Sequence, residues 1–246
     1  MNKKVIYTAI FGDNHFLHDP EIISKEYDYI CFTDSEKYKS KIWEIKKVTP
    51  LYSHNGLNNR KYKVLPHRFL FNYNFSIYVD GDLKITENIG KLAMSYTHES
   101  LSVLDHSLCG IKSTGTLNTR NCIYDEAKFI KWLGDNHPKK HYKDNIETIF
   151  KQMERYKFEG YPLKNGLART SIIMRNHNLS SVIKTMEDWW LELKYWSKRD
   201  QLSFPYVCWK NKFKYKFIPE DIDNNIWVKL MKKWRTDQLE KKIKNK

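Results

Sequence analysis

The sequence predicts an α/β fold, in which a mostly parallel central sheet is flanked by helices. Short apolar runs of β-branched and aromatic residues recur along the chain and alternate with segments of helical periodicity, as in strand–helix–strand units. The chain has 246 residues, of which 41% are hydrophobic and 15% aromatic, enough to bury one sizeable core. No internal repeat and no long Pro/Gly/Ser linker divides it. We therefore expect one domain over residues 1–224, followed by a basic segment over 225–246.

Six strands are expected in chain order, each a short run of residues with high β-propensity. They are Val5–Ile10, Tyr27–Thr33, Trp43–Val48, Phe75–Val79, Leu101–Leu104 and Ser171–Met174. The first run follows two lysines and faintly resembles a signal peptide. It is too short for one, however, and ends at Gly12 without a small-residue cleavage site, so it is interpreted as a strand.

Two helices have the clearest periodicity. Apolar residues from Leu179 to Leu193 recur at helical spacing and predict a helix capped by Asn178. A second stripe, 146–153, follows Asp144 and Glu147, which are spaced as a capping box, and Gly160 lies beyond its end. Both helices are interpreted as scaffold.

The C-terminal segment 225–246 is predicted to be a basic amphipathic helix. Its apolar stripe consists of Ile226, Trp227, Leu230, Met231 and Trp234. Eight cations against Asp237 and Glu240 give the segment a charge of +6. Such a helix can lie on an anionic membrane surface, or it can pack on its own domain with a solvated basic face. Both interpretations stay open.

Composition limits the function classes. The net charge of +14 suits nucleic acid, an anionic membrane or phosphorylated ligands, and it also fits a generally lysine-rich composition. No recognised nucleic-acid-binding module is present, so no nucleic-acid partner is expected. The four cysteines lack metal-binding spacing and are expected to be reduced thiols. No apolar stretch reaches the ~18 residues needed to cross a bilayer, so we expect a cytoplasmic protein, at most peripheral on the inner face of the membrane.

The strongest functional motif is Asp80-Gly81-Asp82, directly after the buried-type run Phe75–Val79. Residues i and i+2 of an extended chain project to the same side, so both carboxylates can face one ligand at the carboxyl end of a parallel strand. Two hard oxygen ligands suit Mg²⁺ or Mn²⁺ shared with a diphosphate. The alternative is an ordinary surface Asp-Gly turn.

Two further segments carry candidate side chains. Arg60 and Lys63 lie on an expected helix before that strand, where they can meet phosphate oxygens or simply be solvated. Arg199, Asp200 and Gln201 open another helix. The Asp-Gln pair can hold hydroxyl groups or stabilise a developing positive charge, or it can be only a helix cap.

Stretches throughout the chain carry a family resemblance, and they follow one another in the family's order from about residue 7 to 206. They are Tyr7–Gly12, Cys31–Asp34, Tyr62–His67, Ile77–Gly81, His106, Tyr124–Ala127, Ile172–His177 and Ser197–Phe204. They resemble the glycosyltransferase-like family that includes plant mucilage-associated proteins and many bacterial ones, within the nucleotide-diphospho-sugar transferase (GT-A, Rossmann-like) fold.

The resemblance implies a hexosyltransferase-like enzyme of polysaccharide biosynthesis, which moves a sugar from a UDP-sugar to a glycan or lipid-linked glycan. The implied donor-binding residues are Thr8, Phe11, Gly12, Asp34, Arg60, Lys63, Asp80 and Gly81. The implied metal ligands are Asp80 and Asp82, for Mn²⁺ or Mg²⁺. The implied catalytic residues are Arg199, Asp200 and Gln201, and the Asp-Gln pair favours retention of anomeric configuration.

Two histidines remain open. His106 and His177 are candidates to position an acceptor or phosphate, or they are structural histidines with satisfied hydrogen bonds. Many enzymes of this fold use a late histidine as a third metal ligand, yet no histidine follows His177. Two other functions were weighed: a metal-dependent nucleotidyltransferase or phosphohydrolase, which would also use paired aspartates, and a non-enzymatic basic nucleic-acid-binding protein.

Overall fold

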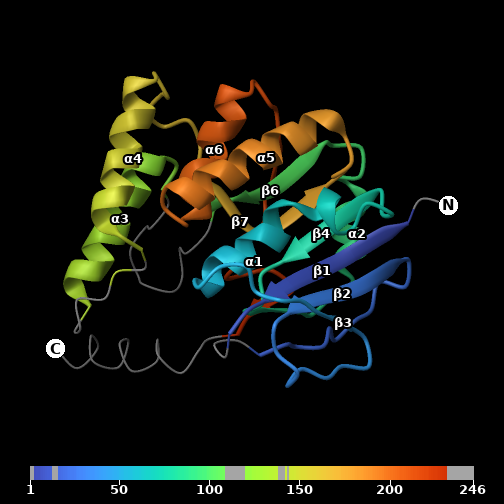
Figure 1. Ribbon diagram of the computed structural model, residues 1–246. Helices are drawn as coiled ribbons and strands as arrows, with labels where there is room; N and C mark the ends of the chain where they lie inside the picture. Colours follow the sequence, from blue (N-terminus) through green and yellow to red (C-terminus); the bar gives the residue numbers. More distant parts are fainter. Residues whose placement is uncertain (1–2, 13–15, 109–119, 138–141, 143, 232–246) are drawn as a thin grey trace.

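The computed structural model describes residues 3–12, 16–108, 120–137, 142 and 144–231, and Figure 1 shows its arrangement. Its centre is a seven-stranded sheet with the order β3-β2-β1-β4-β7-β6-β8. The strands are β1 Lys4–Ile10, β2 Tyr27–Thr33, β3 Glu44–Lys47, β4 Phe75–Val79, β6 Leu101–Asp105, β7 Ala168–Arg175 and β8 Lys216–Ile218. All six strands expected from the sequence are therefore confirmed, with boundaries shifted by at most a few residues.

The sheet is mixed, although most of it is parallel. Strands β1 to β4 run parallel to one another, whereas β7 is antiparallel to both of its neighbours, β4 and β6. The reversed direction brings the start of β7 beside the end of β4, where the backbone N–H of Asp80 donates to the Ser171 carbonyl at 2.9 Å. Chain segments separated by about ninety residues thus meet at the edge where a parallel sheet binds its ligands.

Six helices pack on this sheet in the described part of the chain. They are α1 Asn55–Val64, α2 Ile89–Met94, α3 Ile123–Asn136, α4 Ile146–Phe158, α5 Ser180–Tyr195 and α6 Asp200–Lys210. Helix α5 contacts both α1 and α6 over one face, and α3 and α4 lie side by side at one end of the molecule (Figure 1). The opposite face is covered by α2 and by a small sheet of β5 (Leu83–Ile85) and β9 (Val228–Leu230).

The predicted helices are present, but their caps differ from the expectation. The cap of α4 is Asn145, whose side-chain oxygen accepts from the Thr148 N–H at 2.8 Å. Asp144 instead accepts a hydrogen bond from the backbone of Lys198 and so joins α4 to the start of α6. Asn178 does not cap α5, because its amide donates to carbonyls of the Phe71–Tyr73 loop. Adjacent Asn and Asp residues compete for the same cap, and tertiary contacts decide between them.

The helix predicted over 225–246 is wrong in its first part. Val228–Leu230 form strand β9, antiparallel to β5 (Leu83–Ile85), and the Trp227 indole N–H donates to Glu220. Val228 is buried, and Trp227 and Leu230 pack on the core beneath the sheet. A free strand edge just after Asp82 gives these residues backbone partners that a helix cannot use. Residues 232–246, with Trp234 and most of the cations, lie outside the described residues.

Two smaller expectations can be compared with the structure. Cys31, Cys122 and Cys208 are buried free thiols, as expected, whereas Cys109 lies outside the described part of the chain. Among the described helices, none combines the length and the apolar character required to span a bilayer.

Candidate active site

A cavity of about 260 Å³ opens at the carboxyl end of β4. Its polar lining comes from six separate segments of the chain and consists of Arg60, Asp80, Asp82, His106, Arg120, Glu126, Arg169, Thr170, Ser171, Arg199, Asp200 and Gln201. Its apolar lining is Leu83, Phe129, Ile130, Leu133 and Leu230. The structure thus brings Asp80 and Asp82 together with the Arg199-Asp200-Gln201 segment, which is distant in sequence.

The two aspartates lie in the turn between β4 and β5. The Leu83 N–H donates to the Asp80 carbonyl at 3.0 Å and closes the turn. A side chain at Gly81 would place its Cβ 2.8 Å from Ile10 Cγ1 on β1, so this position leaves no room for one. On the other side, the N–H of Met231 donates to the Asp82 carbonyl at 2.8 Å, so that β9 holds the turn from outside.

Lys63 joins the two acidic groups of the site from beneath. Its ammonium lies 3.1 Å from Asp80 Oδ1 and 2.6 Å from Asp200 Oδ2, and its side chain is 1% exposed. The first residue of α6 and the residue directly after β4 are therefore tied to one buried cation of α1. The expectation that Lys63 contacts the donor directly is wrong, because its ammonium is covered and already occupied by two carboxylates.

Asp200 is the most strongly stabilised carboxylate of the site. Burial alone would raise its pKa, but Arg60, Lys63 and Arg199 outweigh burial and hold the pKa well below its usual value. The Thr170 hydroxyl donates to Oδ2 at 3.0 Å, and Arg60 Nε lies 3.5 Å from the same oxygen. Asp200 is therefore a permanent anion and a weak base, and it is more than a helix cap.

Asp82 has the opposite electrostatics. Burial and then the charge of Asp80 raise its pKa to about 6, and only weaker effects, including that of Arg169, oppose this. Two partly exposed carboxylates crowded on one turn fit a divalent cation, which would relieve their repulsion. Among the described residues, no group of three or more acidic, His or Cys side chains is placed to hold a metal ion, so a bound ion would complete its shell with substrate oxygens or water.

The far wall of the cavity carries a second charged cluster. Glu126, buried on α3, accepts from Arg120 Nε at 2.5 Å and lies 4.0 Å from Arg199. His106 lies next to this cluster at the end of β6 and is 5% exposed. Burial lowers the pKa of His106 to about 4, so its ring is neutral at pH 7. No described residue is hydrogen-bonded to its Nδ1.

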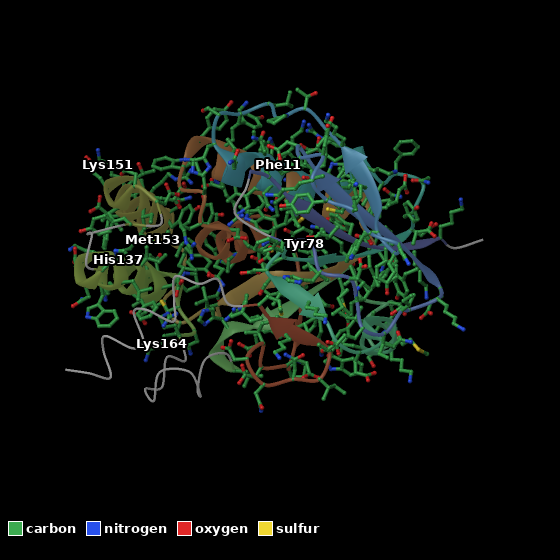
Figure 2. The ribbon with its side chains drawn as sticks, turned by 90° about the horizontal axis from the view of Figure 1, so that it is seen from below. Phe11, Tyr78, His137, Lys151, Met153 and Lys164 are labelled. Carbon is green, nitrogen blue, oxygen red and sulfur yellow. The ribbon has the colours of Figure 1, made fainter. Side chains whose placement is uncertain are left out.

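The other expected donor residues gather around the ends of β1 and β2. The Gly12 N–H donates to Asp34 Oδ1 at 3.0 Å, which joins the two strand ends. Phe11, labelled in Figure 2 with Tyr78 of β4, stacks on Tyr62 with ring centroids 5.5 Å apart. These residues and the buried Thr8 do not line the cavity, so they form a neighbouring region beside the aspartates.

His177 does not belong to this site. Its Nδ1 is 2.9 Å from the Ser76 hydroxyl, and its Nε2 is 2.9 Å from the Leu70 carbonyl. Ser76 lies at the beginning of β4, whereas the aspartates follow its end. Burial lowers the pKa of His177 to about 4. The acceptor or phosphate role is therefore wrong for His177, and the structural alternative fits it.

Five polar residues of the cavity were missed by sequence reasoning: Arg120, Glu126, Arg169, Thr170 and Ser171. Glu126 lies inside one of the quoted stretches, Tyr124–Ala127, which was the only signal for it. Arg169 and Thr170 begin a strand whose antiparallel direction places them at the cavity. Strand direction is set by tertiary contacts, so neither residue could have been found by pattern alone.

Residues 1–235 match the family described as TOD1/MUCI70, glycosyltransferase-like domain. The alkaline ceramidase TOD1 of Arabidopsis thaliana is 25% identical over 235 residues, covering 82% of this chain and 47% of that protein, so the chain spans about half its length. The solved apo structure of the bifunctional glycosyltransferase WbbM shares 9% identity, covers 88% of this chain and 38% of that chain, and has a TM-score of 0.46. By the match over residues 1–235, the chain belongs to the TOD1/MUCI70 glycosyltransferase-like family.

Proposed function

We propose that this chain is a GT-A-type glycosyltransferase that moves a sugar from a nucleoside-diphosphate donor, a UDP-sugar, to a glycan or lipid-linked glycan. The observation that carries the proposal is the meeting of Asp80 and Asp82 with Asp200 in one charged cavity at the carboxyl end of β4. Family membership adds support, because its domain is described as glycosyltransferase-like. The region around Gly12 and Asp34 would take the nucleoside, one strand position away from the aspartates.

Asp80 and Asp82 would hold Mn²⁺ or Mg²⁺ together with the donor diphosphate. The ion would neutralise charge on the departing nucleoside diphosphate. Arg60 lines the same cavity and its guanidinium would add to this stabilisation without forming a covalent bond. A diphosphate leaving group needs such help because its charge increases as the bond to the sugar breaks.

Asp200 would act as a fixed negative charge beside the anomeric carbon. A general base works best with a pKa near the operating pH, and the neighbouring cations keep the pKa of Asp200 far below it. An ionised carboxylate instead stabilises the positive charge that develops on the sugar ring. Gln201, whose N–H donates to Asp200 Oδ1 at 3.2 Å, would hold hydroxyl groups of the sugar or acceptor.

The relative named alkaline ceramidase suggests a second activity, hydrolysis of a lipid amide. Such a substrate carries two long hydrocarbon chains and needs an extended apolar surface. The cavity is instead lined by four arginines, four carboxylates and a histidine. This polar lining favours a sugar nucleotide over a lipid amide. It equally suits phosphoryl transfer, so the test includes both alternatives.

The test is incubation of the purified chain with a panel of nucleotide sugars and Mn²⁺, with nucleoside diphosphate release measured. The same protein is offered ceramide and nucleoside triphosphates in parallel. Release from one donor, dependent on Asp80, is expected. Ceramide cleavage or pyrophosphate release, with every nucleotide sugar left intact, would refute the proposal. Exposed Asp125, which lies 3.6 Å from Lys128 and does not line the cavity, provides the Asp125→Asn control.

A further inference from the structure

The far wall of the cavity has more positive charge than its own acidic group can balance. Arg120 and Arg199 share the single carboxylate of Glu126. Arg169 lies on the same lining, and its Nε donates to the uncharged Ser171 hydroxyl at 3.1 Å. Arg199 also stabilises the Asp200 carboxylate, and Arg169 lowers the pKa of Asp82, which belongs to the pair facing the donor. Three guanidinium groups and one carboxylate, that of Glu126, therefore line this wall.

Unused hydrogen-bond donors and acceptors accompany this excess charge. Neither Arg199 Nε nor His106 Nδ1 has a hydrogen-bond partner among the described residues, although both atoms are covered from solvent. A buried polar atom without a partner is costly, so such atoms commonly mark a place where a ligand binds. Neutral His106 can donate or accept one hydrogen bond there, and guanidinium groups present paired N–H donors that match carboxylate and phosphate oxygens.

The order of the strands places this wall away from the nucleoside region. Gly12 and Asp34 follow β1 and β2, the aspartates follow β4, and Arg169 and His106 lie on β7 and after β6. The sheet order β2-β1-β4-β7-β6 therefore puts the two aspartates between the nucleoside region and the arginine wall. A donor spanning from β2 to β4 leaves the β7–β6 side for the second substrate.

We infer that the acceptor is anionic, and that Arg169 and Arg199, with His106, bind a carboxylate or phosphate group on it. This rests on the proposed function and names the class of its second substrate: an acidic glycan, such as one containing uronic acid, or a phosphorylated one. Glu126 and Arg120 position the Arg199 guanidinium at one side of the subsite.

The test is equilibrium binding, which needs no turnover. Methyl β-glucuronide and glucose 6-phosphate are compared with methyl β-glucoside and glucose by saturation-transfer NMR, in the presence of saturating UDP and Mn²⁺. The anionic member of at least one pair should bind about tenfold more tightly, as expected for charge-assisted hydrogen bonds. Which pair shows the preference distinguishes carboxylate from phosphate. Equal binding within both pairs would overturn the inference.

Variants assign the preference to the wall. Arg169→Gln and, separately, Arg199→Gln should lose most of the preference for the anionic ligand. Arg169→Lys should keep part of this preference, and Arg68→Gln should leave it unchanged. Arg68 is the matched control because it pairs with Glu187 outside the cavity. UDP binding by the same proteins reports whether the donor site is intact. Loss of UDP affinity in step with glucuronide affinity would make these arginines diphosphate ligands and overturn the inference.

A third arm distinguishes acceptor from donor as the source of the anion. Arg169→Gln could weaken the binding of UDP-glucuronate relative to that of UDP-glucose, while free methyl glucuronide does not bind in the presence of UDP. In that case the acidic group belongs to the donor sugar, and the inference fails. Failure of wild-type protein to bind UDP at all would instead refute the proposed function. The two failures are therefore separable in one set of titrations.

Discussion

The Lys63 ammonium lies 2.6 Å from Asp200 Oδ2, although 137 residues separate the two in sequence. This pair joins α1 to the first residue of α6 beneath the cavity, and the same ammonium reaches Asp80 at 3.1 Å. One buried cation thus holds the carboxylates of Asp80 and Asp200 in place. Function and stability should therefore depend on Lys63 together.

We expect Lys63→Met to destabilise the protein by about 3 to 5 kcal/mol and to abolish donor turnover, because the buried Asp200 carboxylate loses one of its cationic partners. Chemical denaturation measures the first effect and nucleoside diphosphate release the second. Adding Asp200→Asn should recover part of the stability but none of the turnover. Lys151→Met is the control, since Lys151 forms an exposed helical pair with Glu147. Equal stability of Lys63→Met and wild type would contradict the bridging role.

Asp80→Asn should bind Mn²⁺ at least about tenfold more weakly while the protein remains folded, because the change removes a ligand charge and keeps the side-chain volume. Asp82→Asn should act in the same direction. Mn²⁺ titration followed by electron paramagnetic resonance gives the affinities, and circular dichroism checks the fold. Wild-type Mn²⁺ affinity in both variants would remove the two aspartates from the metal site.

His177 should make the folded chain sensitive to acid. Burial, helped by the charges of Arg175 and His67, lowers its pKa from 6.5 to about 4. Between these values the unfolded chain binds a proton that the folded chain does not, so stability falls as pH falls from 6.5 to 4. The contribution is about 1.4 kcal/mol per pH unit at most. His106, with a pKa of about 4, adds a second contribution of the same sign.

The variant His177→Gln tests this effect. It should be less stable than wild type at pH 7.5, because it loses at least one of the hydrogen bonds to Ser76 and Leu70. The difference should narrow toward pH 4.5, where wild type has lost the contribution of His177. His98→Gln is the control, since the side chain of His98 is 72% exposed. Parallel stability curves for His177→Gln and wild type would contradict the assignment.

The strands were predictable because their signal is local. The run Phe75–Val79 consists mainly of residues with high β-propensity, and it forms a buried central strand with the predicted bounds. A functional motif directly after such a strand is positioned by the strand itself, so Asp80 and Asp82 could be assigned to a site in advance. Asp200 and Gln201 lie in that site as well, but the sequence did not reveal that Asp200 is held by Lys63.

The remainder depended on long-range contacts. Arg169 reaches the cavity only because β7 is antiparallel, and Glu126 only because α3 closes its far wall. The stripe from Ile226 to Met231 fits a helical period, yet the free edge of β5 recruits Val228–Leu230 as a strand. Short apolar runs cannot be assigned to helix or strand from periodicity alone, and here a neighbouring edge decides.

The recruited strand leads to a last prediction, which concerns Met231. Its N–H donates to the Asp82 carbonyl at 2.8 Å. This hydrogen bond links the residue after β9 to the Asp-Gly-Asp turn. Met231→Pro removes this donor, whereas Met231→Leu keeps it with a side chain of similar size. The first variant should bind Mn²⁺ and UDP several-fold more weakly, because the turn carrying Asp82 becomes less ordered. Its unfolding midpoint should change little, since the seven-stranded sheet is untouched. The Leu variant should match wild type in both measurements; equal losses in the two variants would attribute the effect to the methionine side chain and not to the backbone hydrogen bond.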